Sequence, residues 1–198
     1  MKAVKAHPFA CVILAAGAGT RFGEPKAGAE WQPGVRFIDA VVELAQWAGA
    51  DPIIAAVPPG LAVPAGVRAL VNADAKGEQV VSLRMALAQL TNSPAEGVLV
   101  WPVDHPAVRI ESVLALVDAA RRTGAHIAIP TSEGRRGHPT WFHRETWREL
   151  VTVREGGARA VVQADPSRVL EVPVGDAGVR RDIDTRADLD AARAAQPA

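Results

Sequence analysis

The chain has 198 residues, of which 48% are hydrophobic, and its 22 basic side chains are balanced by 22 acidic ones. This length is enough for one buried core, so we expect a single globular domain spanning residues 1–198. The zero formal net charge provides no overall positive field for a polynucleotide, which argues against nucleic acid as a partner.

Strand-like apolar runs alternate with helical segments along the first two thirds of the chain. Short apolar runs bounded by turn residues predict buried strands at residues 9–16, 52–57, 97–103 and 125–130. Apolar residues at helical spacing predict helices that begin at Phe37, Gly77 and Ile110. This alternation predicts a mostly parallel sheet with helices on both faces, in which ligands bind beyond the carboxyl ends of the strands.

The remaining segments give weaker signals. Proline-rich and polar stretches at residues 58–64 and 91–97 predict surface connections, and the last third reads as a strand, short helices, another strand and a closing helix. The single cysteine, Cys11, lies inside the first apolar run, so we expect a core residue and no internal disulfide. That run is too short to span a membrane, so we expect a cytoplasmic protein with no membrane partner.

The segment LAAGAGTRFGEPK, residues 14–26, follows the first predicted strand and is typical of a phosphate-binding loop. Gly17 and Gly19 allow backbone amides to approach an anion closely. The dinucleotide fingerprint would need a glycine where Phe22 stands, and the P-loop would need serine or threonine directly after Lys26. The loop instead carries two cations, Arg21 and Lys26, which suit a triphosphate and a pyrophosphate leaving group. The structural alternative is a solvated turn with surface charges.

Two acidic segments supply candidate ligands for a hard cation. In WPVDHPAV, Asp104 directly follows a predicted strand, and in RDIDTRADL, Asp182 and Asp184 would share one face of an extended segment. Mg²⁺, with Mn²⁺ as an alternative, is held by one or two carboxylates plus substrate phosphates, which suits Asp104 with Asp184. Asp104 could instead shape a turn, and Asp184 or Thr185 could cap the last helix.

The glycine loop resembles the signature of the MobA-like NTP transferases, a family of nucleotidyltransferases with a glycosyltransferase-A-like fold. The resemblance runs in order from Val12 to about Ala191. It implies a three-layer α/β/α, Rossmann-like domain in which the loop wraps a nucleoside triphosphate. The family roles carried over are Gly17 and Gly19 for the phosphates, Arg21 and Lys26 for catalysis and phosphate binding, Asp104 for catalysis with Asp184 as its partner metal ligand, and Leu14, Ala15 and Ala16 for the base.

Two further segments are similar to the family. VNADAKGEQVVSLRMAL resembles the segment that faces the base, which makes Asn72, Gly77 and Ser82 candidate nucleotide contacts, although each could be a cap, a turn or a solvent-facing residue. GRRGHPTWF resembles the stretch that lines the acceptor site, which makes Arg135, Arg136 and His138 candidate acceptor contacts, since guanidinium groups pair well with phosphate. His138 could equally bond to the backbone. GGARAVVQ, residues 156–163, also resembles a family segment.

The resemblance predicts a Mg²⁺-dependent enzyme that transfers a nucleotidyl group from a nucleoside triphosphate to a phosphorylated acceptor. We expect residues 9–110 to bind the nucleotide and residues 111–198 to bind the acceptor. The favoured acceptor is molybdopterin or molybdenum cofactor, with CTP or GTP as donor, and the alternative is a sugar phosphate or another small metabolite. A non-catalytic accessory protein that serves a molybdoenzyme is the rival from another class. A dinucleotide-dependent oxidoreductase is disfavoured by the glycine spacing and by the helical position of Asp39.

Overall fold

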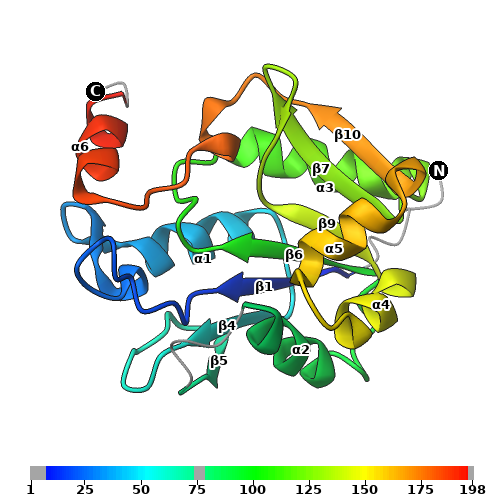
Figure 1. Ribbon diagram of the computed structural model, residues 1–198, viewed down its shortest axis with the longest axis horizontal. Coiled ribbons are helices and arrows are strands. Elements are labelled where there is room, and N and C mark those ends of the chain that lie inside the picture. Colours follow the sequence, from blue (N-terminus) through cyan, green and yellow to red (C-terminus); the bar gives the residue numbers. More distant parts are fainter. Residues whose placement is uncertain (1–7, 74–78, 196–198) are drawn as a thin grey trace.

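A computed structural model describes residues 8–73 and 79–195, and most of its strands form one sheet (Figure 1). The strands of this sheet are β1 (Ala10–Leu14), β4 (Ile53–Val57), β5 (Val67–Val71), β6 (Gly97–Pro102), β7 (Ile127–Ser132), β8 (Arg135–Arg136), β9 (Thr140–His143) and β10 (Val169–Pro173). Their order is β10-β7-β9-β6-β1-β4-β5, with β8 paired to β7. Only β8 and β9 run antiparallel to their neighbours, so the predicted α/β fold with a mostly parallel sheet is confirmed.

The helices cover both faces of the sheet. They are α1 (Phe37–Trp47), α2 (Gln79–Gln89), α3 (Ile110–Thr123), α4 (Trp147–Thr152), α5 (Gly157–Ala164) and α6 (Arg186–Ala194). Side chains of α1, α3 and α6 form one hydrophobic core, and those of α2, α4 and α5 form the other. The helices α2, α4 and α5 lie near one another in Figure 1. Successive β1 residues alternate between the two cores: Cys11 and Ile13 pack in the first, Val12 and Leu14 in the second. A strand buried on both faces must be apolar throughout, which is why β1 and β6 were predictable from sequence.

Four strands lie outside the predicted elements. β5 has a single buried residue, Leu70, because it is the edge strand of the sheet, and its sequence therefore lacks a continuous apolar run. The strands β2 (Glu30–Gln32) and β3 (Val35–Arg36) form a separate antiparallel pair, and β8 has only two residues. Strands as short as these three carry no recognisable period. All four depend on their partners rather than on local sequence.

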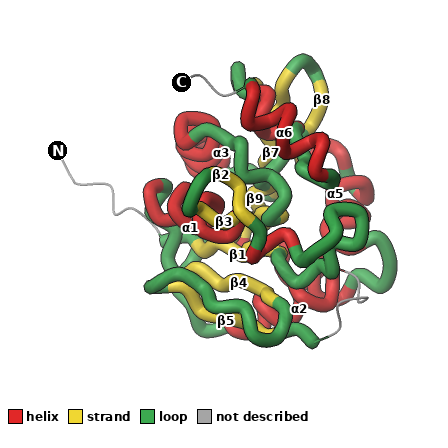
Figure 2. Tube along the Cα trace, turned by 90° about the vertical axis from the view of Figure 1, so that its left-hand side faces the viewer, coloured by secondary structure: helices red, strands yellow, loops and turns green. Residues whose placement is uncertain are grey.

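The hairpin of β2 and β3 contacts both α1 and the last helix, α6. Figure 2 shows it beside α1, and Trp31 packs edge-on against Phe37 with ring centroids 5.7 Å apart. Arg193 of α6 donates from Nε to the Trp31 carbonyl oxygen at 2.7 Å, so the closing helix is tied to this hairpin. Within the described parts of the chain, no helix combines the length and apolarity needed to cross a membrane.

Cys11 offers a probe of the core. The side chain is completely buried in the centre of the sheet, as expected, and burial raises the pKa of its thiol. Since the thiolate is the reactive form, we expect a maleimide to label native protein at least about 10²-fold more slowly than urea-unfolded protein. Mass spectrometry of timed samples measures this. Rapid labelling of the native protein would show that the sheet opens around β1.

Candidate active site

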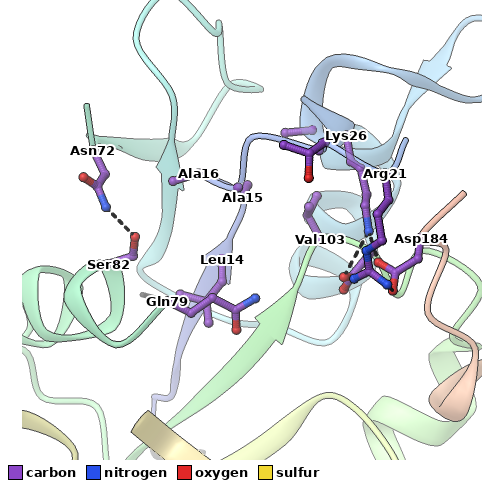
Figure 3. Close-up of a pocket in the computed structure, with 15 residues that line it drawn as sticks. Leu14, Ala15, Ala16, Arg21, Lys26, Asn72, Gln79, Ser82, Val103 and Asp184 are labelled. Atoms are coloured by element: carbon purple, nitrogen blue, oxygen red, sulfur yellow. Dashed lines mark hydrogen bonds and ion pairs between the residues drawn. The ribbon is translucent and has the colours of Figure 1, made fainter. Parts of the chain in front are cut away.

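A cavity of about 220 Å³ lies beyond the carboxyl ends of β1 and β6 (Figure 3). The sequence-predicted residues that line it are Leu14, Ala15, Ala16, Gly17, Gly19, Arg21, Lys26, Asn72, Ser82, Asp104 and Asp184. The structure therefore brings the glycine loop, the proposed base contacts and both acidic segments to one place. Gly77 falls outside the described residues. A ligand in this cavity would lie across the edge of the sheet where α/β proteins bind their substrates.

The glycine loop is held by a buried aromatic residue. The amides of Phe22 and Gly23 both donate to the Gly19 carbonyl oxygen at 2.9 Å, which closes a turn. Phe22 is buried and packs edge-on against Phe37 with ring centroids 5.6 Å apart. Phe22, which stands where the dinucleotide-binding motif would have a glycine, thus anchors the loop in the core. The loop thus lines the cavity and is anchored in the core by Phe22, while most of its other residues, including Arg21, are exposed.

The loop backbone leaves no room for a side chain at Gly19 but does leave room for one at Gly17. Gly19 has a φ of +62°, and a Cβ atom there would lie 1.8 Å from the Glu24 carbonyl oxygen, whereas a Cβ at Gly17 meets nothing within 4 Å. We expect Gly19→Ala to lower the free energy of unfolding by about 1–3 kcal/mol. Gly17→Ala, the matched control, should stay within about 1 kcal/mol of wild type. Urea unfolding measures both, and equal effects would contradict this loop geometry.

The charged wall of the cavity is built around Lys26. Its Nζ lies 2.5 Å from Asp184 Oδ1 and 3.4 Å from Asp104 Oδ2, and its side chain is only 13% exposed. Arg21 pairs with the other Asp184 oxygen at 2.8 Å but is 73% exposed, so its guanidinium reaches into solvent. Figure 3 shows the side chains of Lys26, Arg21 and Asp184 gathered on one side of the cavity. Two cations of the glycine loop therefore meet two carboxylates from distant parts of the chain.

A backbone contact explains how Asp184 reaches this wall. The amide of Ile183 donates to the Asp104 carbonyl oxygen at 2.9 Å, and the buried Ile183 side chain anchors the segment in the core. Thr185 caps α6, and Asp188 completes the capping box by accepting from the Thr185 amide at 2.7 Å. The capping role thus falls to Thr185, which leaves the Asp184 carboxylate available to the site. Asp182 is exposed and does not line the cavity.

The opposite wall carries a buried polar pair. Asn72 donates from Nδ2 to Ser82 Oγ at 2.9 Å, and both residues are buried, so the alternative of a solvent-facing Ser82 is wrong. Figure 3 places this pair across Ala15 and Ala16 from Lys26. Amide and hydroxyl groups can donate and accept hydrogen bonds, as the polar edge of a nucleobase requires. The groups of this wall could therefore form hydrogen bonds with a nucleobase, whereas the cations of the charged wall could bind phosphates.

Two histidines, the buried His105 and the partly buried His138, lie beside the charged wall. The His105 and His138 rings are 4.7 Å apart, and Nδ1 of each is buried without a hydrogen-bond partner among the described residues. Burial lowers the pKa of His105, and burial reinforced by His105 lowers the pKa of His138 to about 3. Both rings are therefore neutral at pH 7. His105 Nε2 lies 3.8 Å from Asp104 Oδ1, too far for a hydrogen bond.

The predicted acceptor contacts do not converge. His138 lines two further cavities, of which the first shares Leu14 and Gln79 with the cavity described above. Arg136 lines only the second and is paired with Glu171 at 2.8 Å, and exposed Arg135 lines neither. A different arginine, Arg159 on the first turn of α5, lines both. The sequence signal for Arg159 was the GGARAVVQ segment. Other cavity residues that sequence reasoning missed are Thr20, Ala27, Gln79 and Val103, neighbours of predicted residues without a chemical signature of their own.

The MobA-like NTP transferase domain model matches residues 11–169. Among curated proteins, the 2-C-methyl-D-erythritol 4-phosphate cytidylyltransferase of Deinococcus radiodurans is 35% identical over 153 residues, which cover 74% of this chain. The match spans only 60% of that relative's length.

Solved structures share the fold over nearly the whole chain. Rv0371c of Mycobacterium tuberculosis H37Rv is 26% identical with a TM-score of 0.80, and the match covers 96% of this chain and 98% of that one. Its manganese complex gives 25% identity and a TM-score of 0.77, with coverage of 96% and 100%. The 2-C-methyl-D-erythritol 4-phosphate cytidylyltransferase of Thermus thermophilus is 22% identical with a TM-score of 0.73, covering 94% and 98%, and shows the fold alone. The chain belongs to the MobA-like NTP transferase domain family.

Proposed function

We propose that this protein transfers a nucleotidyl group from a nucleoside triphosphate to the phosphate of a small phosphorylated metabolite. An acceptor phosphate oxygen forms a bond to the α-phosphorus, the bond from that phosphorus to the bridging oxygen breaks, and pyrophosphate leaves. The observation that carries the proposal is the meeting of Lys26, Asp104 and Asp184 beside the glycine loop. The acceptor phosphate is already ionised, so the reaction needs positioning and charge neutralisation more than acid or base catalysis.

Different residues of the charged wall would bind different phosphates of the nucleoside triphosphate. The amides near Gly17 and Gly19 and the exposed Arg21 are placed to bind the outer phosphates, which leave as pyrophosphate. Lys26 is nearly buried and carries a compact charge, which suits contact with the α-phosphate. Positive charge at both positions stabilises the negative charge that develops on the phosphoryl oxygens and the leaving group. In the structure, Lys26 forms ion pairs with both carboxylates.

Asp104 and Asp184 fit a divalent cation. Asp104 Oδ1 is buried without a hydrogen-bond partner among the described residues, and such an orphaned oxygen is suited to a metal ion. The described residues contain no cluster of three or more His, Cys, Asp or Glu side chains able to hold a metal, so two carboxylates would share the ion with substrate phosphates, as Mg²⁺ prefers. When bound, Mg²⁺ or Mn²⁺ would supply positive charge to the triphosphate. The manganese complex of Rv0371c supports a divalent ion in this family.

The buried pair of Asn72 and Ser82 would then bind the base, with Leu14, Ala15 and Ala16 beneath it. CTP is the first donor to test, because the Deinococcus relative is named a cytidylyltransferase. We propose that residues 9–110 bind the nucleotide and residues 111–198 the acceptor, except that Asp184 crosses to the nucleotide side. Among the described residues, Asp184 is the one member of the later half that lines the cavity beside the glycine loop, whereas residues of both halves line the neighbouring cavity that contains His138 and Arg159.

The acceptor class follows from the relatives rather than from the loop. The Deinococcus relative is named for 2-C-methyl-D-erythritol 4-phosphate, which supports a small phosphorylated metabolite over molybdopterin. Molybdopterin is the second candidate, because the glycine loop resembles the branch that makes molybdenum cofactor dinucleotides. A non-catalytic accessory protein for a molybdoenzyme is disfavoured, since nucleotide binding alone would not require both acidic segments.

Pyrophosphate release tests the proposal. The protein is incubated with Mg²⁺ and each of ATP, GTP, CTP and UTP, with a panel of phosphomonoesters and with molybdopterin. We expect release with one triphosphate that depends on the acceptor. Binding of a triphosphate without release in any combination would contradict the enzymatic assignment and favour the accessory protein.

A further inference from the structure

An arginine of the last helix lies on the glycine loop, outside the cavity that the proposed reaction uses. Helix α6 begins at Arg186, directly after its cap Thr185. The Arg186 guanidinium lies 4.3 Å from the centre of the Phe22 ring and donates from Nη2 to Glu24 Oε1. In Figure 1, α6 stands at the edge of the molecule, next to the blue loops that follow β1. The Arg186 side chain therefore joins the closing helix to the glycine loop.

The position of Arg186 is set before any ligand binds. Thr185 and Asp188 form the capping box that fixes the first turn of α6, where Arg186 is the first residue. The Phe22 ring on which the guanidinium rests is buried and held by its edge against Phe37. A guanidinium is planar and attracted to the face of an aromatic ring, so this contact orients its donors toward the neighbouring carboxylate.

The Glu24 carboxylate is a liability in a loop that binds phosphates. Glu24 lies two positions before Lys26, and its carbonyl oxygen is so close to Gly19 that a Cβ atom there would be 1.8 Å away. A negative charge on this part of the loop would repel a triphosphate and compete with it for Lys26 and Arg21. Neither Glu24 nor Arg186 lines the cavity, because the ion pair holds the carboxylate on the outer side of the loop.

We propose that Arg186 is a positioning residue that keeps the Glu24 carboxylate away from the triphosphate and thereby sets the affinity of the glycine loop for nucleotide. This inference rests on the proposed function, because it assumes that the phosphates bind at this loop. An exposed ion pair contributes little to stability, so the contact matters for binding rather than for folding. Arg186 acts through Glu24 and touches neither the cavity nor the proposed metal ligands.

A double-mutant cycle of Arg186→Met and Glu24→Gln tests the inference. Each protein is titrated by calorimetry with Mg²⁺ and each of ATP, GTP, CTP and UTP. We expect Arg186→Met to weaken the best-bound triphosphate by at least about fivefold, because methionine still packs on Phe22 but releases the Glu24 carboxylate. Glu24→Gln alone should stay within about twofold of wild type, and the double variant should return to within about twofold. Such non-additivity shows that Arg186 acts through Glu24.

Arg193→Met is the matched control on the same helix. Arg193 donates to the carbonyl oxygens of Trp31 and Glu30, so it ties α6 to the β2–β3 hairpin instead of to the glycine loop. Its loss should change triphosphate affinity by less than about twofold. Arg186 is more than half exposed, so its replacement should leave the fold intact, which thermal unfolding checks.

The outcomes separate this inference from the function on which it rests. Unchanged affinity of Arg186→Met, a loss of affinity that Glu24→Gln does not reverse, or an equal loss in Arg193→Met would overturn the role of Arg186 while leaving triphosphate binding by the wild type intact. Failure of every triphosphate to bind the wild type would overturn the proposed function itself, and the inference with it.

Discussion

Lys26→Met is expected to lower the rate of pyrophosphate release by about 10²- to 10³-fold, because it removes a preorganised positive charge from the phosphates in the transition state. Lys26 is the least exposed cation of the cavity wall, at 13%, and two carboxylates fix its position. Methionine keeps much of the length of the side chain without its charge. A steady-state assay with saturating triphosphate and acceptor measures the change.

Arg181→Met is the matched control for this variant. It also removes one positive charge near the acidic segment, but Arg181 does not line the cavity, so the rate should stay within about twofold of wild type. Thermal unfolding of both variants checks that the fold is retained. A folded Lys26→Met protein with a rate near wild type would remove Lys26 from the catalytic machinery.

Asp104→Asn is expected to have an effect on the order of 10³-fold on the same rate, because a divalent ion is worth several kcal/mol to the reaction and would lose a charged ligand. The amide keeps the shape of the carboxylate, and the Asp104 carbonyl oxygen can still accept from Ile183. We also expect Mn²⁺ binding in the presence of triphosphate to weaken, which electron paramagnetic resonance of the free ion measures without any turnover.

Asp182→Asn provides the control for Asp104→Asn. Asp182 is two residues from Asp184 yet exposed and outside the cavity, so its loss should leave both Mn²⁺ binding and turnover nearly unchanged. If Asp182→Asn weakened Mn²⁺ binding as much as Asp104→Asn, the ion would be held by the general negative potential of the segment rather than by a defined pair of ligands.

The lining of the cavity beside the glycine loop was largely predictable, because most of its chemically distinctive residues directly follow predicted strands. The glycine loop directly follows a strand that is buried on both faces, and Asp104 directly follows another, so the order of residues places both at one edge of the sheet. Asp184 could be proposed as a site residue from its residue type. Its short distance to Lys26 could not be predicted from the sequence. That distance depends on the hydrogen bond between Ile183 and Asp104, which joins positions far apart in the chain.

The acceptor side was less predictable because it depends on partners that sequence does not reveal. Arg135 and Arg136 were expected there as adjacent cations, but the partner that holds Arg136, Glu171, lies 35 positions away on β10. Arg159 became a candidate only when α5 was seen to border two cavities. In the same way, β5 escaped prediction because an edge strand needs few buried side chains.

Titration calorimetry with ATP, GTP, CTP and UTP, each with Mg²⁺, tests the central claim most directly when it is repeated on Asp104→Asn. We predict that one triphosphate binds wild-type protein at least about tenfold more tightly than the others and that the variant loses this binding, because Asp104 would hold the ion that accompanies the phosphates. Absence of binding to the wild type, or binding that the substitution leaves unchanged, would contradict a metal–nucleotide site at Lys26, Asp104 and Asp184.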